Sequence, residues 1–314
     1  MKSTKVSVRE SDLHNLVRAG MNRHIPGVRY AAQRIESSLG RWPEKADALR
    51  KVYVDNYATM PKQGDTPLVR AYEHPDSTMP PRLPAKIQED LDSFILERQA
   101  RNALQEVGEA PRSVLLFAGP PGVGKTMTAR WLARELSLSL FEVCLAANVD
   151  SYMGVTGKNL QSVIDFAQSQ PCVLFLDEAD AFLRARGGTS TQDKEMDRAV
   201  NILLKAIEEW SAESVILMAT NLPDSIDDAM WRRFDSCIHF PLPSENEIYY
   251  IVRDASLPIP VSIEVIRRRM DVFVGKSASD IVRIVRASKR KLVLQKKKKE
   301  DTVLSELWKE FALI

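Results

Sequence analysis

The stretch SVLLFAGPPGVGKT, residues 113–126, joins an apolar run to a glycine-rich loop and decides the interpretation of the chain. The loop from Gly119 to Thr126 matches the pattern G-x-x-x-x-G-K-[ST] completely. Glycines let such a loop fold around phosphates, so that backbone N–H groups and the start of the next helix face the anion. We therefore predict that Lys125 reaches the β- and γ-phosphates of a nucleotide and that the Thr126 hydroxyl coordinates magnesium. An ordinary glycine turn is the alternative.

Strand-like and helix-like patterns alternate from this loop onward. Strands are predicted at 114–118, 139–143, 172–176, 215–219 and 237–240, and helices at 125–137, 157–168 and 193–210. Such alternation predicts an α/β fold, in which a parallel sheet carries helices on both faces. We assign residues 85–243 to this α/β nucleotide-binding domain and predict four helices, forming a small helical lid domain, in residues 244–314.

The chain before this domain has a different pattern. Apolar positions three and four apart between residues 11 and 58 predict two or three helices, so residues 1–60 are assigned to a helical N-terminal adaptor or substrate-recognition region. Residues 61–84 contain six prolines, which exclude a continuous helix. This segment is predicted to be a linker, or a loop that lies along the next domain.

A second polar element follows the apolar run CVLFL at residues 172–176. Open parallel sheets hold their ligands at the carboxyl ends of their strands, where Asp177 and Glu178 stand. Asp177 is predicted to hold magnesium, directly or through water, and Glu178 to polarise the attacking water. Asp180 receives no role. The alternative is an acidic turn at the surface.

The next apolar run, VILMAT, ends in a neutral polar residue, Asn221. An amide at this place can orient a lytic water without adding charge, so Asn221 is predicted to be a second water-positioning residue. The alternative is a plain strand-ending asparagine.

Two adjacent arginines, Arg232 and Arg233, follow about ten residues after Asn221. Guanidinium groups neutralise charge that develops on a transferred phosphoryl group, and a neighbouring subunit can supply them. We predict this catalytic role for both. Ion pairs with Asp227, Asp228 or Asp235 are the alternative.

These elements, in this order, resemble the AAA family of ring ATPases in its narrow sense, within the wider AAA+ superfamily. The resemblance covers residues 85–290. It implies an ATP- and Mg²⁺-dependent ATPase that assembles as a homo-oligomeric ring, usually a hexamer, with ATP at the subunit interfaces. The loop residues that would bind the nucleotide are Gly119, Pro120, Pro121, Gly122, Val123, Gly124, Lys125, Thr126 and Met127.

Further segments are similar to parts of the same family. Tyr152, Met153 and Gly154 look like the central pore loop, which grips an extended polypeptide; a helix-capping loop is the alternative. The segment 184–193 is a candidate for a second, weaker pore loop. Gly275 and Ala278 stand where the family lid meets adenosine, although Ala278 replaces a frequent glycine. The sensor arginine of related proteins is absent there, and Lys276 is a candidate substitute.

Composition limits the remaining choices. The chain of 314 residues has 44 basic and 42 acidic side chains, a net charge of +2 that does not indicate a nucleic-acid-binding cation. One local excess, which we call the basic cluster, is read as a solvated surface or as a docking patch; it consists of Arg286, Lys289, Arg290, Lys291 and Lys296 to Lys299.

Cellular location is predicted from what the sequence lacks. The three cysteines occur singly and the four histidines are scattered, so neither a disulfide framework nor a histidine metal site is expected. The start of the chain has no apolar leader region, and no apolar run approaches the roughly 20 residues that cross a bilayer. We expect a soluble cytoplasmic protein without membrane partners.

Three functional hypotheses remain. The first is a ring ATPase that remodels, unfolds or disassembles a protein substrate through its pore. A small N-terminal region followed by one AAA module resembles bacterial stand-alone remodellers, some of which, of the pachytene-checkpoint type, disassemble HORMA-domain complexes, including in anti-phage defence. The second is a nucleic-acid-associated ATPase, a loader or transposition regulator, that uses the basic cluster. The third is a scaffold that binds ATP without turnover, against which Glu178, Arg232 and Arg233 argue.

Overall fold

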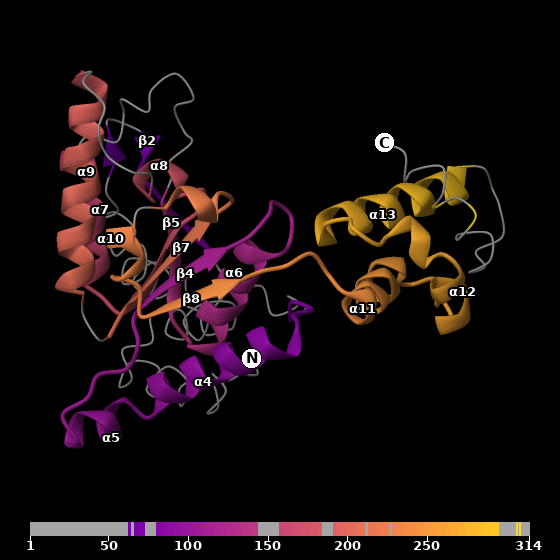
Figure 1. Cartoon of the computed structure of the whole chain (residues 1–314), viewed down its shortest axis with the longest axis horizontal. Coiled ribbons are helices and arrows are strands. Elements are labelled where there is room, and N and C mark those ends of the chain that lie inside the picture. The colour runs from indigo at the N-terminus through magenta and orange to yellow at the C-terminus, as the bar shows by residue number, and fades with distance from the viewer. Residues whose placement is uncertain are drawn as a thin grey trace, which may run out of the picture.

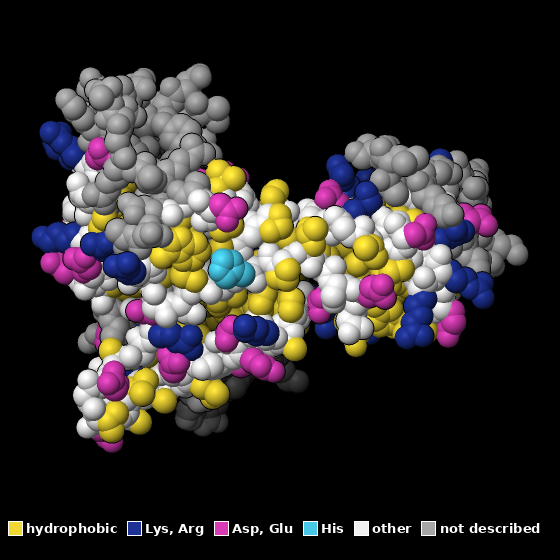
Figure 2. Space-filling model, in the orientation of Figure 1, with side chains coloured by type: hydrophobic (Ala, Val, Ile, Leu, Met, Phe, Trp, Pro, Cys, Tyr) yellow, Lys and Arg dark blue, Asp and Glu magenta, His cyan; other side chains and the backbone are white. Residues whose placement is uncertain are grey.

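A computed structural model of the chain describes residues 62–63, 66–72, 80–143, 157–183, 191–210, 213–226 and 228–294, together with residues 306 and 308. Two bodies are visible (Figure 1): an α/β core and a smaller helical unit, which we call the lid. They meet at a narrow waist (Figure 2). The region 1–60 lies outside the described residues.

The core is built on a six-stranded sheet in the order β3-β5-β6-β7-β4-β8. These strands are β3 (Val69–Tyr72), β4 (Val114–Ala118), β5 (Ser139–Val143), β6 (Cys172–Leu176), β7 (Val215–Thr220) and β8 (Ser236–His239). All neighbouring pairs are parallel except β3 with β5. Every residue of β4, β6 and β7 is buried, as expected of strands covered on both faces. The predicted α/β class with a parallel sheet is confirmed.

Helices cover both faces of this sheet (Figure 1). On one face pack α4 (Ala85–Gln99) and α6 (Lys125–Glu135), and on the other α7 (Gly157–Gln168) and α9 (Thr191–Glu208). Side chains of β4 alternate between the two layers, since Leu115 joins the α4 and α6 layer and Leu116 the opposite one. Short helices complete the core: α5 (Arg101–Glu106), α8 (Asp180–Leu183), α10 (Asp228–Trp231) and the 3₁₀ turn η1 (Pro223–Ser225).

The proline-rich segment contains a strand that the sequence did not predict. Within 61–84, β3 pairs antiparallel with β5 at the sheet edge, with Val69 opposite Val143 and Tyr72 opposite Leu140. A two-stranded ladder of β1 (Lys62–Gln63) and β2 (Thr66–Pro67) precedes it. A four-residue strand is too short for its period to stand out among prolines, and its partner lies far along the chain.

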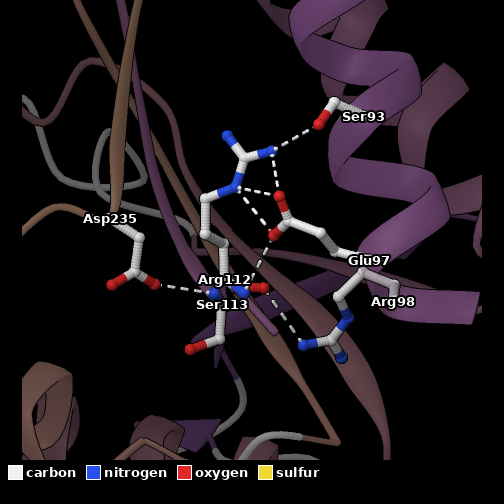
Figure 3. A network of polar contacts seen from close by, with 6 residues as sticks. All are labelled: Ser93, Glu97, Arg98, Arg112, Ser113 and Asp235. Carbon is white, nitrogen blue, oxygen red and sulfur yellow. Dashed lines mark hydrogen bonds and ion pairs between the residues drawn. The ribbon is translucent and has the colours of Figure 1, made fainter. Parts of the chain in front are cut away.

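A polar network joins α4 to the start of β4 (Figure 3). Arg112 donates to the Glu97 carboxylate at 2.7 and 2.8 Å, and Arg98 donates to the Arg112 carbonyl at 3.3 Å. Asp235 accepts the backbone N–H groups of Ser113 and Val114. The hydrogen bond from Arg112 lowers the pKa of Glu97, and burial lowers the pKa of Arg98 to about 10.

The lid has its own hydrophobic core. It contains α11 (Glu245–Ser256), α12 (Ile263–Arg268), the 3₁₀ turn η2 (Met270–Val272) and α13 (Ala278–Leu294). Trp308 is fully buried against Phe273, with ring centroids 5.2 Å apart. Four helices were predicted for residues 244–314, and three α-helices lie in the described part of the lid up to Leu294. After Leu294 only residues 306 and 308 are described, and both are helical.

Two smaller expectations concern cysteines and membranes. Burial raises the pKa of Cys172 to about 12 and that of Cys237 to about 11, so both are protonated thiols at neutral pH. Cys144 lies outside the described residues. Among the helices that the structure describes, none is both long and apolar enough to cross a bilayer.

Candidate functional site

The glycine-rich loop connects β4 to α6 at the carboxyl end of the sheet. Gly119, Gly122 and Gly124 have φ values of 151, 76 and 107°, and α6 begins directly at Lys125. A Cβ atom on Gly119 would stand 2.2 Å from the Phe240 carbonyl oxygen. A Cβ atom on Gly122 would stand 2.1 Å from the Ser279 hydroxyl of the lid. Glycine is therefore required at these two positions, where the loop contacts Phe240 and the lid residue Ser279.

Lys125 is buried at the centre of this loop. The residue is only 6% exposed. Its Nζ donates hydrogen bonds to the carbonyl oxygens of Gly119 at 2.6 Å and Pro120 at 2.8 Å, and to Asn221 Oδ1 at 2.9 Å. Burial lowers the pKa of the Lys125 ammonium, while the Asp177 and Asp180 carboxylates oppose that shift. The loop thus holds a positive charge inside a cradle of backbone, which suits a polyphosphate.

Thr126 and Asp177 bring two oxygen ligands together. Thr126 Oγ1 donates to Asp177 Oδ2 at 2.6 Å, although 51 residues separate them in sequence. A hydroxyl and a carboxylate are ligands that Mg²⁺ takes from proteins when phosphates complete its shell. The pair therefore fits a magnesium–nucleotide complex. Glu178 is exposed next to Asp177 in a left-handed conformation with φ of 52°.

Asn221 is held at the same edge by neighbours that its sequence position did not reveal. Asp180 Oδ1 accepts the hydroxyl of Thr220 and the backbone N–H of Asn221, the latter at 3.1 Å. The sequence offered only one signal for Asp180: it stands three residues after Asp177, beyond the same strand. That β6 and β7 are neighbours, which brings Asp180 to Thr220, is a property of the sheet order.

A cavity of about 840 Å³ lies between the loop and the lid. Gly122, Val123, Gly124 and Met127 line its core side, and Ala278 lines its lid side. Gly275 is not among its lining residues; it lies in the turn between η2 and α13 with φ of 80°, and its nucleotide contact stays a prediction. Lys276 does not line the cavity either.

Two contacts join the lid to the core around this cavity. The backbone N–H of Ser279, in the first turn of α13, donates to the Gly122 carbonyl at 2.9 Å. Arg82, which precedes α4, donates to Asp254 of α11 at 2.8 and 2.9 Å and stacks 5.4 Å from the Tyr250 ring centroid. The sequence did not single out Arg82, because nothing local to it indicates a partner 172 residues away.

Comparison with known proteins identifies the fold. The family described as "ATPase family associated with various cellular activities (AAA)" matches residues 115–242. Residues 115–242 are therefore similar to the AAA family. The chain is 35% identical over 205 residues to "Uncharacterized AAA family ATPase y4kL" of Sinorhizobium fredii (strain NBRC 101917 / NGR234), an alignment that covers 65% of this chain and 62% of that one.

Two further relatives extend the comparison. Identity is 41% over 144 residues to "26S proteasome regulatory subunit 10B" of Dictyostelium discoideum, covering 44% of this chain and 36% of that one. The chain thus spans between about a third and two thirds of the length of these curated relatives. The solved FIGL-1 AAA domain superposes with a TM-score of 0.63 at 20% identity, over 78% of this chain and 85% of that chain, which establishes likeness of fold.

The two arginines of the AAA domain have different surroundings. Arg233 pairs with Glu208 of α9 at 3.0 Å, a partner that the sequence did not suggest. Asp235, offered as an alternative partner, accepts backbone N–H groups instead. Arg232 is exposed, and within the described residues it has no hydrogen-bond or ion-pair partner. The structure therefore separates two residues that the sequence could only treat together.

The predicted pore-loop residues of the AAA domain, Tyr152, Met153 and Gly154, lie outside the described residues, as does 184–190 of the second candidate pore loop.

Proposed function

We propose that this chain binds Mg²⁺–ATP and hydrolyses it. The observation that carries the proposal is the convergence, at one sheet edge, of a buried lysine in a glycine loop, the Thr126–Asp177 pair and the Lys125–Asn221 hydrogen bond. Bound Mg²⁺ would neutralise phosphate charge and draw electrons from the bond that breaks. Thr126 and Asp177 would hold it.

The remaining residues would act on water and phosphate. Lys125 would leave the loop carbonyl oxygens for the β- and γ-phosphate oxygens. Glu178, an exposed carboxylate beside Asp177, would take the proton of the attacking water. Asn221 would orient that water or a γ-phosphate oxygen through its amide, and Met127 and Ala278 would contact the nucleoside in the cavity.

The decisive experiment compares phosphate release by the wild-type chain and by Glu178→Gln. We expect hydrolysis to fall by about 100-fold or more, because the general base is lost, while ATP binding is retained. Glu109→Gln, at an exposed position outside the site, is the matched control and should hydrolyse ATP normally. Equal rates above background would mean that Glu178 is not the general base, and no hydrolysis above background by either protein would leave only nucleotide binding without turnover.

We further propose that a neighbouring subunit supplies Arg232 to this site. Its exposed, unpartnered guanidinium in the described chain supports this assignment, whereas Arg233 is engaged by Glu208. An arginine acting on the transferred phosphoryl group contributes about 10³-fold or more to hydrolysis. Arg232→Ala should therefore abolish hydrolysis and Arg233→Ala should reduce it less. Measurement across protein concentration tests the ring, because hydrolysis by wild type should rise as subunits assemble.

The proposed purpose of hydrolysis is protein remodelling in a ring, usually a hexamer. The named proteasome regulatory subunit among the relatives supports this class. Tyr152→Ala should keep basal hydrolysis and lose its stimulation by an unfolded polypeptide. A HORMA-type substrate and a role in anti-phage defence remain predictions of the sequence, and so does cytoplasmic location.

The nucleic-acid alternative has less support. Lys289 of the basic cluster donates to the carbonyl oxygens of Ala255 and Leu257, and Arg286 and Arg290 line the cavity. Of the four described residues of the cluster, two thus line the cavity and a third is bonded to the lid backbone. If DNA nevertheless stimulates hydrolysis, and neutralising Lys296 to Lys299 removes that stimulation and its salt dependence, the remodelling proposal is replaced.

A further inference from the structure

Asp180 is a carboxylate beside the site to which neither the sequence nor the proposed reaction gives a task. It lies in the first turn of α8, just beyond β6, and is half-buried. One oxygen, Oδ1, accepts two hydrogen bonds from the end of the neighbouring strand β7: one from the hydroxyl of Thr220, and one of 3.1 Å from the N–H of Asn221. The carboxylate therefore contacts the chain at the residue before Asn221 and at Asn221 itself.

The surrounding contacts make this link rigid. Thr220 is 1% exposed, and its Oγ1 also accepts the N–H of Leu222 at 3.0 Å, so one hydroxyl connects both sides of Asn221. The backbone N–H of Ala179 donates to the Ala219 carbonyl at 2.8 Å, which ties the residue before Asp180 to the residue before Thr220. From this fixed backbone the Asn221 side chain reaches Lys125 Nζ at 2.9 Å.

We infer that Asp180 is a positioning residue: it fixes the backbone of Asn221, and thereby the place where the Asn221 amide meets the γ-phosphate or the attacking water. This inference rests on the proposed ATP hydrolysis and adds a residue to it. A carboxylate suits the task because it accepts two donors at once, and charged acceptors form the stronger hydrogen bonds. Displacement of a reacting or orienting group by about 1 Å can reduce a rate about 100-fold.

The first test separates nucleotide binding from turnover. Asp180→Ala should lower kcat by about tenfold to 100-fold, with the Kd for a fluorescent ATP analogue within about twofold of wild type, because the phosphate loop and Lys125 remain. Asp180→Asn keeps a carbonyl oxygen as acceptor and should recover most of the lost rate. Asp165→Ala is the matched control: in the described part of the chain, the carboxylate of this aspartate on α7 accepts a hydrogen bond from Gln161 alone.

The second test asks whether Asp180 acts through Asn221. In an Asn221→Ala background, adding Asp180→Ala should lower kcat by no more than about twofold, because the amide to be positioned is gone. Full additivity of the two losses would mean a structural effect unrelated to Asn221 and would overturn the inference. So would equal rates for Asp180→Asn and Asp180→Ala, since geometry would then not be the cause.

Two further measurements keep the test decisive. If Asp180→Ala does not fold, Thr220→Val and Thr220→Ser ask the same question, because only the valine removes the hydroxyl that Asp180 binds. The valine variant should lose turnover and the serine variant should keep it; the reverse, or no difference, contradicts the inference. Absence of hydrolysis by wild type would instead remove the proposed function, and Asp180→Ala turning over at the wild-type rate would remove this inference alone.

Discussion

In the glycine loop beside the cavity, Lys125 is 6% exposed and donates hydrogen bonds to three oxygen atoms, whereas on the lid wall of the cavity Arg286 and Arg290 are exposed on α13. The core residues stand at the edge of a buried sheet and are hydrogen-bonded to one another. The lid has a separate hydrophobic core and meets the core wall through Gly122–Ser279 and Arg82–Asp254. From this difference we predict that phosphate chemistry depends on the sheet, whereas affinity for the nucleoside depends on the position of the lid.

The largest effect should come from the glycine loop of the core. Lys125→Met keeps an apolar stem but removes the ammonium from the loop, so nucleotide affinity should fall by about 100-fold, because the charge that faces the phosphates is lost. Isothermal titration with ATP and Mg²⁺ measures this. Lys158→Met, on the exposed side of α7, is the matched control and should bind normally. Normal binding by Lys125→Met would mean that the loop does not receive phosphates.

A second change acts where the two walls touch. Gly122→Ala places a methyl group 2.1 Å from Ser279 Oγ and displaces the start of α13, so nucleotide affinity should fall by about tenfold. Gly108→Ala is the control for backbone strain: its φ of 81° is as unfavourable, but nothing lies within 4 Å of the added atom. Both variants should unfold at lower temperature, and only Gly122→Ala should bind nucleotide more weakly.

A third, smaller effect should come from the lid wall. Arg82→Ala removes the ion pair to Asp254 and the stacking on Tyr250, so the Kd for ADP should rise about threefold to tenfold as the lid loses one attachment. Arg253→Ala is the control, since Arg253 pairs with the same carboxylate but lies on the same helix α11. If both variants bind ADP equally well, the Arg82 contact does not set lid position.

The smallest effect concerns the end of β4 remote from the loop. Because Arg112 lowers the folded-state pKa of Glu97, this carboxylate stabilises the fold above its unfolded pKa of about 4.3, and the contribution disappears as the pH falls through the folded value. Glu97→Gln should therefore lower the free energy of unfolding by about 1 kcal/mol at neutral pH and by less in acid. Chemical unfolding across pH measures this.

Glu89→Gln, at an exposed position on the same helix, should show no such pH dependence. Nucleotide affinity should be unchanged in both variants; a loss in Glu97→Gln would show that the two ends of β4 are coupled.

Local patterns were sufficient for the core elements. The predicted strand 172–176 and helix 157–168 agree residue for residue with β6 and α7, because buried parallel strands are continuous apolar runs and amphipathic helices have a clear period. Strand β3 and the contact between Arg82 and Asp254 could not be predicted in this way, since each depends on a partner far along the chain.

The sequence by itself determined that a glycine loop, an acidic pair and Asn221 follow successive buried strands, because apolar runs and turn residues are local signals. Only the tertiary structure decided that β6 and β7 are neighbours, and therefore that Asp180 meets Thr220 and Asn221. It also separated Arg232 from Arg233 by bringing Glu208 to the second. The reason is physical: strand order and helix docking follow from which surfaces bury the most apolar area together, and a single segment does not contain that information.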